Sequence, residues 1–340
     1  MGTRTGWGRH AAGLAAGLAL GAAVAPADAQ SRWLPRLQWE NDGFNFWIHP
    51  AHRPDEEYTN GLRIAMDAYG APWWGRRFGK DRPDCAADAD DTGACLTTTL
   101  TLAQEMYTPH LARVPFSTPD WERERPYFGW LYLAGEGHVV TRRALRTFGL
   151  TLGVTGPPSG AQVLHAAAHL VNRRFARTVS GWETQVGFEP GVIASYRHTV
   201  MALHLGSRRA AMVQVMPSAG VSLGNVQTGA DVGGLARVGL NLTHPWDPRN
   251  WTDRRPLELW VQAGGKLEYV ARDMSLDGTL VNPGRRVVRI PGVQEVEYGA
   301  GVRFFGLSLA YRVVTRGQEY LTGPRRHTYS SLSTAVTVVP

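Results

Sequence analysis

The sequence predicts an all-β protein, namely a 12-stranded antiparallel β-barrel that spans a membrane and carries a short helix in an extracellular loop. Three observations predict this class. Apolar residues alternate with polar or small residues along many segments, no segment beyond the N-terminal one is apolar for long enough to form a transmembrane helix, and aromatic residues recur at the ends of the alternating segments. Without such helices a chain crosses a membrane only as a closed barrel, because every backbone polar group must be paired inside the bilayer.

The alternation is clearest between residues 147 and 154. Phe148, Leu150, Leu152 and Val154 alternate there with Thr and Gly, which gives one lipid-compatible face and one small or polar face. Runs of this kind predict strands near residues 33–42, 57–69, 96–107, 127–137, 143–154, 182–204, 211–223, 228–242, 256–271, 292–304, 306–315 and 327–339. Their number is even, as a bacterial single-chain barrel requires, although 182–204 is long enough for two strands.

The composition of the 340 residues excludes several other classes of protein. With 43% hydrophobic residues, 39 Gly and only 2 Cys, the chain is neither disordered, nor collagen-like, nor a disulfide scaffold. Only 19% of the residues are charged and 12 are Trp, which is typical of a protein in contact with lipid. A soluble β-sandwich would explain the alternation, but it would not explain aromatic residues at strand ends such as Trp130, Tyr132 and Trp182.

Residues 1–29 have the pattern of a secretory signal peptide. Two arginines precede an apolar run from Ala11 to Ala25, and Ala27-Asp28-Ala29 offers the small residues that signal peptidase recognises. An uncleaved anchor is the alternative, but the run is shorter than the roughly 20 residues that a spanning helix needs. We therefore expect residues 30–340 to form one transmembrane barrel domain, with a net charge reduced from +7 to +6 by the loss of two Arg and one Asp.

Barrel topology predicts which loops face outward. Such barrels begin on the periplasmic side, so the connections after odd-numbered strands are extracellular. These are roughly residues 43–56, 108–126, 155–181, 224–227, 272–291 and 316–326. Cys85 and Cys95 fall in a periplasmic loop, where an oxidising environment favours a single disulfide that closes the loop.

The first group of candidate functional residues lies where the first two predicted strands meet. Glu40-Asn41-Asp42 ends one strand, and Tyr58-Thr59-Asn60-Gly61 begins the next. With Asn41 and Thr59 on the lumen side, an amide, a carboxylate and a hydroxyl would converge at the rim as cation ligands or oxyanion donors. The alternative is that Asn-Asp-Gly only marks a turn and that Tyr-Thr is ordinary strand sequence.

The second group lies on a predicted helix from Ala161 to Phe175, after Gly156-Pro157-Pro158-Ser159-Gly160. Gln162, His165 and His169 share one face of this helix at spacings of three and four residues. His169 suits a general base because an unperturbed histidine titrates near pH 6.5. A solvated pair of histidines is the alternative interpretation.

The third group consists of arginines in the predicted extracellular loop before residue 127. Arg113, Arg123 and Arg125 lie beside an aromatic segment, and arginine suits the phosphate groups of an anionic lipid. A basic rim without a specific ligand is the alternative. All three groups nevertheless fall on the same predicted side of the barrel, which strengthens the functional interpretation.

Together these residues resemble the outer-membrane lipid A 3′-O-deacylase (LpxR) family, and the resemblance covers essentially the whole mature chain. The stretches that carry it are Glu40-Asn41-Asp42, Tyr58-Thr59-Asn60-Gly61-Leu62, Gln104-Glu105-Met106-Tyr107-Thr108-Pro109, Arg125-Pro126-Tyr127 through Trp130-Leu131-Tyr132, Gly156-Pro157 with Gln162 and His169, Gly181-Trp182 with Gln185 and Glu189-Pro190, and Val314-Thr315 before Glu319-Tyr320. In this order the stretches are specific, whereas none is specific alone.

The resemblance implies a site between the barrel wall and a loop helix, and Ca²⁺-dependent hydrolysis of the 3′-linked acyloxyacyl ester of lipid A in the outer leaflet. His169 matches the family's catalytic histidine, Asn41 and Asp42 match its Asn-Asp pair, and Thr59 matches its site Thr or Ser. His169 would deprotonate a water, Asp42 with Asn41 would hold Ca²⁺, and Asn41 or Thr59 would support the oxyanion.

Substrate contacts are assigned to Gln162, His165, Arg113 and Arg125. His165 stands where the characterised enzyme has a glutamine, and Arg113 matches only loosely the basic loop residue that this enzyme uses. The chain also ends in Val339-Pro340, whereas outer-membrane barrels usually end in an aromatic residue.

The expected partners are lipid A or lipopolysaccharide and other outer-membrane lipids, with no nucleic acid, and we expect a monomer in the bacterial outer membrane. Two alternatives remain: a phospholipase of the outer membrane, and a non-catalytic barrel of the porin-like or lipid-binding kind. A porin does not need a loop helix that presents His169 toward Asn41 and Asp42, and this feature separates the classes.

Overall fold

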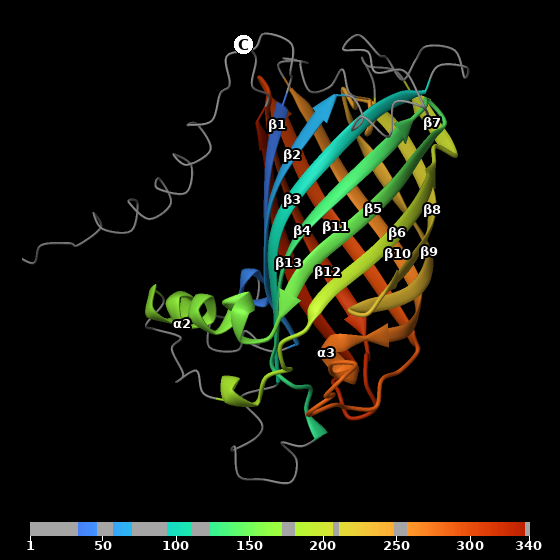
Figure 1. The fold of residues 1–340 in the computed structure, drawn as a ribbon. Coiled ribbons are helices and arrows are strands. Elements are labelled where there is room, and N and C mark those ends of the chain that lie inside the picture. Colours follow the sequence, from blue (N-terminus) through green and yellow to red (C-terminus); the bar gives the residue numbers. More distant parts are fainter. Residues whose placement is uncertain are drawn as a thin grey trace, which may run out of the picture.

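The computed structural model describes residues 33–45, 57–69, 94–109, 123–171, 181–206, 211–247 and 257–336. Within these ranges the chain forms one antiparallel sheet that closes into a barrel (Figure 1). The strands are β1 (Trp33–Asn41), β2 (Glu57–Tyr69), β3 (Cys95–Thr108), β4 (Phe128–Val140), β5 (Ala144–Thr155), β6 (Pro190–Val200), β7 (Leu203–Gly206), β8 (Ala211–Gly224), β9 (Gln227–Leu240), β10 (Glu258–Asp273), β11 (Gly292–Phe304), β12 (Leu307–Gly317) and β13 (Arg326–Val336). The helical elements are η2 (Asp42–Phe44), η6 (Pro157–Ser159), α2 (Ala161–Val171), η7 (Trp182–Thr184) and α3 (Met274–Asp277).

The barrel has twelve strand positions, as the sequence predicts. β1 pairs with both β2 and β13, and β6 pairs with both β5 and β8, so the sheet has no free edge along the wall. β6 and β7 pair one after the other with β8 and therefore occupy a single position. Closure satisfies the backbone hydrogen bonds that a bilayer cannot satisfy. Among the described residues, no helix is both long and apolar enough to cross a membrane.

The structure differs from the predicted elements mainly between residues 182 and 204. The segment Trp182–Thr184 is a 3-10 helix, preceded by Gly181 in the left-handed region (φ 101°), and the strand begins only at Pro190. The predicted loop helix is confirmed as α2, and the short α3 was not predicted. Cys95 is disulfide-bonded. The predicted signal segment 1–29, Cys85 and the C-terminal Val339-Pro340 lie outside the described residues.

The two faces of the wall differ in chemistry. Large apolar side chains such as Leu102, Leu133 and Leu152 point outward and are about half exposed. The lumen holds ion pairs at 2.6 to 3.1 Å, including Arg36–Asp67, Arg63–Glu105, Arg197–Asp231, Arg312–Glu297 and Arg316–Glu295. The outer face is therefore suited to lipid and the inner face to water and charge.

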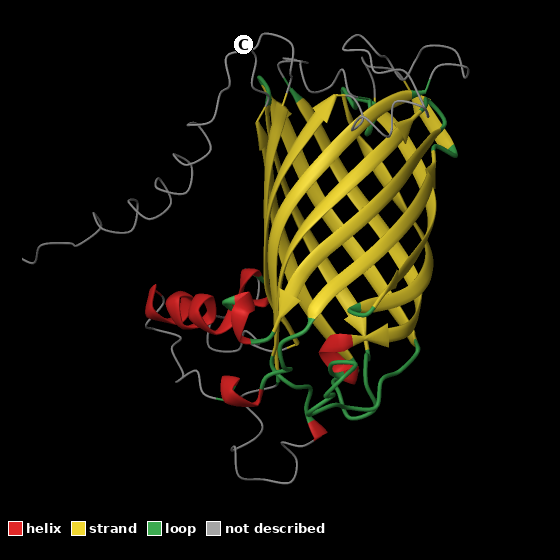
Figure 2. Cartoon of the chain, viewed as in Figure 1, coloured by secondary structure: helices red, strands yellow, loops and turns green. Residues whose placement is uncertain are grey.

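All the helical elements gather at one end of the barrel, which we call the outer end (Figure 2). α3 lies within this end, and its Met274 and Leu276 are fully buried. Met274 packs with Phe128, Trp130, Val186 and Val226, and Tyr58 packs with Val314 and Tyr329. These side chains fill the outer part of the lumen, which separates this barrel from an open water-filled pore.

A charge on the outward face of the wall is expected to destabilise the barrel in a bilayer. Leu150 points outward near the middle of β5 and is half exposed. Leu150→Arg is predicted to lower the free energy of unfolding by about 2–4 kcal/mol, as reported generally for arginine facing the bilayer midplane. Chemical denaturation in lipid vesicles measures this change. Leu280→Arg, in an exposed outer loop, is the matched control, and equal losses in both variants would contradict the assignment of the lipid face.

Candidate functional site

A cluster of polar residues lies on the outward face of the wall at the outer end. Trp39 points outward and is 43% exposed, and its indole Nε1 donates a hydrogen bond to Asn60 Oδ1 at 2.7 Å. Asn41, two residues further on the same face, brings its Nδ2 within 3.3 Å of that Oδ1. Glu40, between them, points into the lumen and bonds Tyr58 and Arg63. The expected lumen position of Asn41 is therefore wrong, because strand alternation places it with Trp39.

A β-bulge turns Thr59 to the same outward face. In the pairing of β2 with β3, Tyr58 faces Tyr107 and Asn60 faces Met106, so Thr59 is the extra residue. Thr59 Oγ1 lies 2.6 Å from Thr108 Oγ1, and the Thr59 carbonyl accepts a hydrogen bond from Asn41 Nδ2 at 2.9 Å. Bulges redirect side chains in this way next to functional sites. Thr59 was also expected in the lumen, and the bulge is the reason that it is not.

Asp42 begins the short turn η2, which folds back over the wall. Asn41 caps this turn, since its Oδ1 accepts a hydrogen bond from Gly43 N at 2.7 Å. Asn45 then fixes the turn to β13, because its Nδ2 donates to the Thr328 carbonyl and its Oδ1 accepts from Ser330 Oγ, both at 2.8 Å. Asp42 is buried beside Asn41 as a result. We call Asn41, Asp42, Thr59, Asn60 and Thr108 the outer-wall cluster.

Helix α2 starts beside this cluster. The preceding Gly156 and Gly160 both have a positive φ (72° and 70°), which permits the tight turn η6. Ala161, the first residue of α2, is buried in a group with Met106, Tyr127 and Trp182. A Cβ on Gly129 would lie 2.5 Å from that of Ala161, so Gly129 allows the helix to approach β4.

The predicted helix residues have different surroundings. His165 is only 2% exposed and accepts a hydrogen bond at Nδ1 from Trp182 Nε1 at 3.1 Å, which ties α2 to η7. Gln162 is exposed. His169 lies in α2, but its side chain, like the whole of Arg113, lies outside the described part of the chain. The catalytic role of His169 thus stays a prediction.

Arg125 lies inside the outer end of the barrel and is fully buried. Its Nη1 contacts Glu57 Oε2 at 2.7 Å and Glu319 Oε2 at 3.3 Å, and its Nη2 donates to Ser275 Oγ at 2.9 Å. The guanidinium also lies 4.4 Å from the centre of the Tyr107 ring. Arg125 therefore joins four segments, a setting that differs from the accessible position expected of a phosphate ligand.

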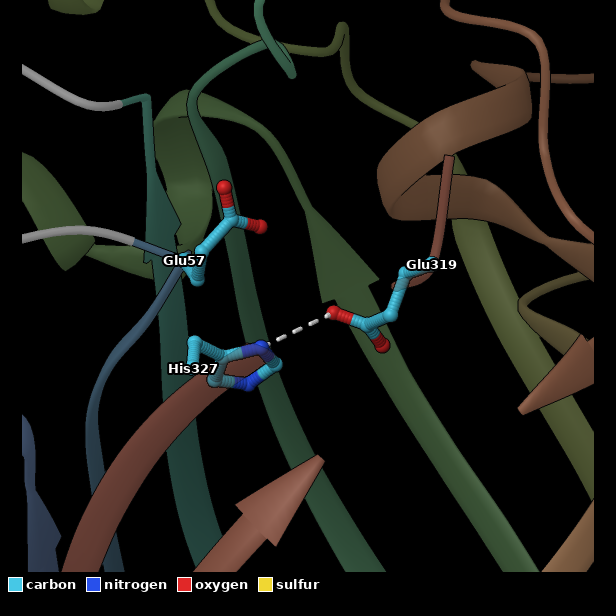
Figure 3. Close-up of side chains that lie close together, drawn as sticks. All are labelled: Glu57, Glu319 and His327. Atoms are coloured by element: carbon cyan, nitrogen blue, oxygen red, sulfur yellow. Dashed lines mark ion pairs between the residues drawn. The ribbon is translucent and has the colours of Figure 1, made fainter. Parts of the chain in front are cut away.

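Glu57, Glu319 and His327 form a buried acidic and histidine cluster that could bind a metal ion (Figure 3). Their ligand atoms all lie within 4.8 Å of one another, and His327 Nδ1 is 3.8 Å from Glu319 Oε2. Arg125 and Arg316 already compensate the two carboxylates. The cluster lies on the lumen side and is separate from the outer-wall cluster.

Two further polar residues of the outward face belong to the Gln104 to Pro109 stretch, which carries part of the family resemblance but was given no role in the predicted site. Thr108 pairs with Thr59. Gln104, further along the same face of β3, is buried, and its Oε1 has no hydrogen-bond partner among the residues that the structure describes. In this stretch, alternation places Gln104, Met106 and Thr108 on the outward face of β3. Two of these three residues are polar, although a lipid-facing position should be apolar. That conflict is a usable sequence signal.

Glu319 makes the stability of the outer end depend on pH. Burial alone would raise its pKa, but Arg316, Arg125 and His327 lower the pKa to about 2. Because the folded pKa is depressed, the stabilisation is present above the unfolded value of 4.5 and is lost as the pH falls toward 2. The expected loss is on the order of 3 kcal/mol.

Thermal unfolding in detergent across this pH range measures the effect. Glu319→Gln should be less stable at neutral pH and should lose less stability on acidification. Glu183→Gln, in η7, is the control for a general acid effect. Superimposable pH profiles for Glu319→Gln and the unmodified protein would contradict the ion-pair account.

The comparisons with known proteins identify the family. The family model described as "Outer membrane protein LpxR" matches residues 14–338. The structure of LpxR from Salmonella typhimurium superposes with a TM-score of 0.68 at 20% identity, covering 90% of this chain and 100% of that chain. The β domain of the Bordetella autotransporter BrkA gives a TM-score of 0.45 at 11% identity, covering 92% and 100%. No curated protein sequence matches the chain significantly. The chain belongs to the LpxR family of outer-membrane proteins.

Proposed function

We propose that this protein is a Ca²⁺-dependent ester hydrolase that removes the 3′-linked acyloxyacyl chain of lipid A in the outer leaflet. The observation that carries the proposal is the outer-wall cluster. Polar residues on the lipid face of a barrel are costly, and here Asn41, Thr59 and Thr108 hold one another in place by hydrogen bonds. A site on this face meets a lipid substrate without removing it from the membrane.

The oxygen donors of the cluster fit the chemistry of Ca²⁺, which prefers carboxylate, carbonyl and hydroxyl ligands. We assign Asp42 as a ligand through its carboxylate and Asn41 through its amide oxygen, which keeps a second lone pair beside the bond to Gly43 N. A bound ion would stabilise negative charge on the ester carbonyl oxygen.

The proposed reaction is a direct hydrolysis. His169 removes a proton from water, and the water oxygen bonds to the acyl carbonyl carbon. The bond between this carbon and the 3′ oxygen of the sugar then breaks. The proton passes to the departing sugar oxygen, so the products are a carboxylic acid and a free 3′-hydroxyl. The hydroxyl of Thr59 supports the oxyanion, while Gln162, His165 and Arg113 remain proposed substrate-binding residues. Arg125 is not kept in this role, because its guanidinium is fully buried on the lumen side and is paired with Glu57 and Glu319.

The porin-like alternative is disfavoured by the buried side chains that fill the outer part of the lumen. The phospholipase alternative differs only in the headgroup that the site accepts, so a substrate comparison decides it. A monomer is the proposed oligomeric state.

Mass spectrometry of lipid A incubated with the purified protein tests the reaction. Loss of the 3′-linked acyloxyacyl group should require Ca²⁺, and His169→Ala should slow it by about 10²–10⁴-fold, as removal of a general base does. His204→Ala, on the exposed strand β7, is the matched control. Unchanged lipid A with a folded barrel would overturn the proposal, and cleavage of glycerophospholipids instead would favour the phospholipase.

Thr59 permits a finer test of the outer-wall cluster. Thr59→Val removes the hydroxyl but keeps the shape, whereas Thr59→Ser keeps the hydroxyl. We expect Thr59→Val to lower kcat by about 10²-fold, as loss of one oxyanion donor does, and Thr59→Ser to retain most of the rate. Equal rates for the two variants would remove Thr59 from the mechanism.

A further inference from the structure

We propose that the exposed side of α2 is a lipid-binding surface that lies in the outer leaflet, against the upper part of the acyl chains. Val163 is 71% exposed and Leu164 is 45% exposed. Ala166 and Ala167 are exposed beside them. Large apolar side chains in such positions are unfavourable in water and favourable at a membrane interface. This inference rests on the outer-membrane location of the family and not on the proposed hydrolysis.

The opposite side of α2 is already occupied. Ala161 and His165, one turn apart, are almost fully buried against Met106 and Trp182. The orientation of the helix about its own axis is therefore fixed by packing, and Val163 is turned away from the protein. No charged residue occurs between Ala161 and Val171. A surface helix normally carries charged or polar residues on the side that faces water, and the exposed side of α2 carries no charged residue.

The position of α2 on the barrel indicates that lipid covers its exposed side. The helix projects sideways from the outer end, with its axis roughly across the barrel axis (Figure 1). It is attached to the wall at Met106, on the outward face of β3. Leu102 lies four residues away on that face and is exposed to lipid, a distance of about 13 Å along a strand. The exposed side of α2 therefore continues the lipid-facing wall and does not cover the lumen.

This placement would make α2 one side of a lipid-accessible space beside the outer-wall cluster. The acyl chains that contact Val163 would lie next to the polar residues near the start of β2. Interfacial helices of this kind lie about 5–10 Å deep, at the boundary of headgroups and acyl chains. An ester at the top of an acyl chain lies at that depth.

Depth-dependent fluorescence quenching tests the surface directly. Val163→Cys in the full-length protein is labelled with an environment-sensitive dye and reconstituted in phosphatidylethanolamine and phosphatidylglycerol vesicles with lipids brominated near the top of the acyl chain. Val281→Cys, at a 93% exposed valine of an outer loop, is the matched control. The dye at residue 163 should lose more than about half of its emission to the brominated lipids, and the dye at residue 281 should lose almost none.

Equal quenching at the two positions, with the barrel shown to be folded, would contradict the proposal that α2 has a lipid-binding surface. A second variant, Val163→Glu, should lower the apparent affinity for lipid substrate in vesicles and leave the folded barrel intact, since the side chain of Val163 is 71% exposed. The quenching result does not depend on catalysis. Quenching at residue 163 in a protein that leaves lipid A intact would support the surface and reject the proposed hydrolysis.

Discussion

Everything in this structure depends on the requirement that backbone polar groups be paired inside a bilayer. Twelve strand positions satisfy it by closing on themselves, with β1 joined to β13 and β6 joined to β8. Closure divides the side chains into a lipid face and a lumen face. Any polar residue on the lipid face then carries a cost that must be offset by bonding or by function.

Hydrogen bonds within the outer-wall cluster offset the free-energy cost of placing polar residues on the lipid face. The bulge at Thr59 and the turn that begins at Asp42 both interrupt regular pairing at the rim, and Asn41 connects them by bonding to Gly43 and to the Thr59 carbonyl. Behind the wall, Glu57 at the start of β2 has a positive φ of 61° and is held by Arg125 and Tyr320. The lumen network thus fixes the strand end that carries the bulge.

Most of the fold could be predicted from the sequence, because alternation reports directly on the two faces of a strand. The same rule was misleading near the rim. Alternation predicts that Thr59 faces the lumen, but the bulge between Tyr58 and Asn60 turns it outward, and alternation alone cannot reveal a bulge. For Asn41 a signal existed, since Trp39 is a lipid-facing residue of the same strand. Arg125 lies in a buried ion-pair network because of contacts between segments up to 194 residues apart, which local sequence does not encode.

We propose that lipid A binds at the outward face of the wall and not in the lumen. A photoreactive phenylalanine analogue at Asn60, in the outer-wall cluster, tests this in intact outer membranes, with the same analogue at the lumen-facing Gln38 of β1 for comparison. We expect a crosslink to lipopolysaccharide from residue 60 and none from residue 38. A crosslink from residue 38, or none from residue 60 in a folded barrel, would contradict it.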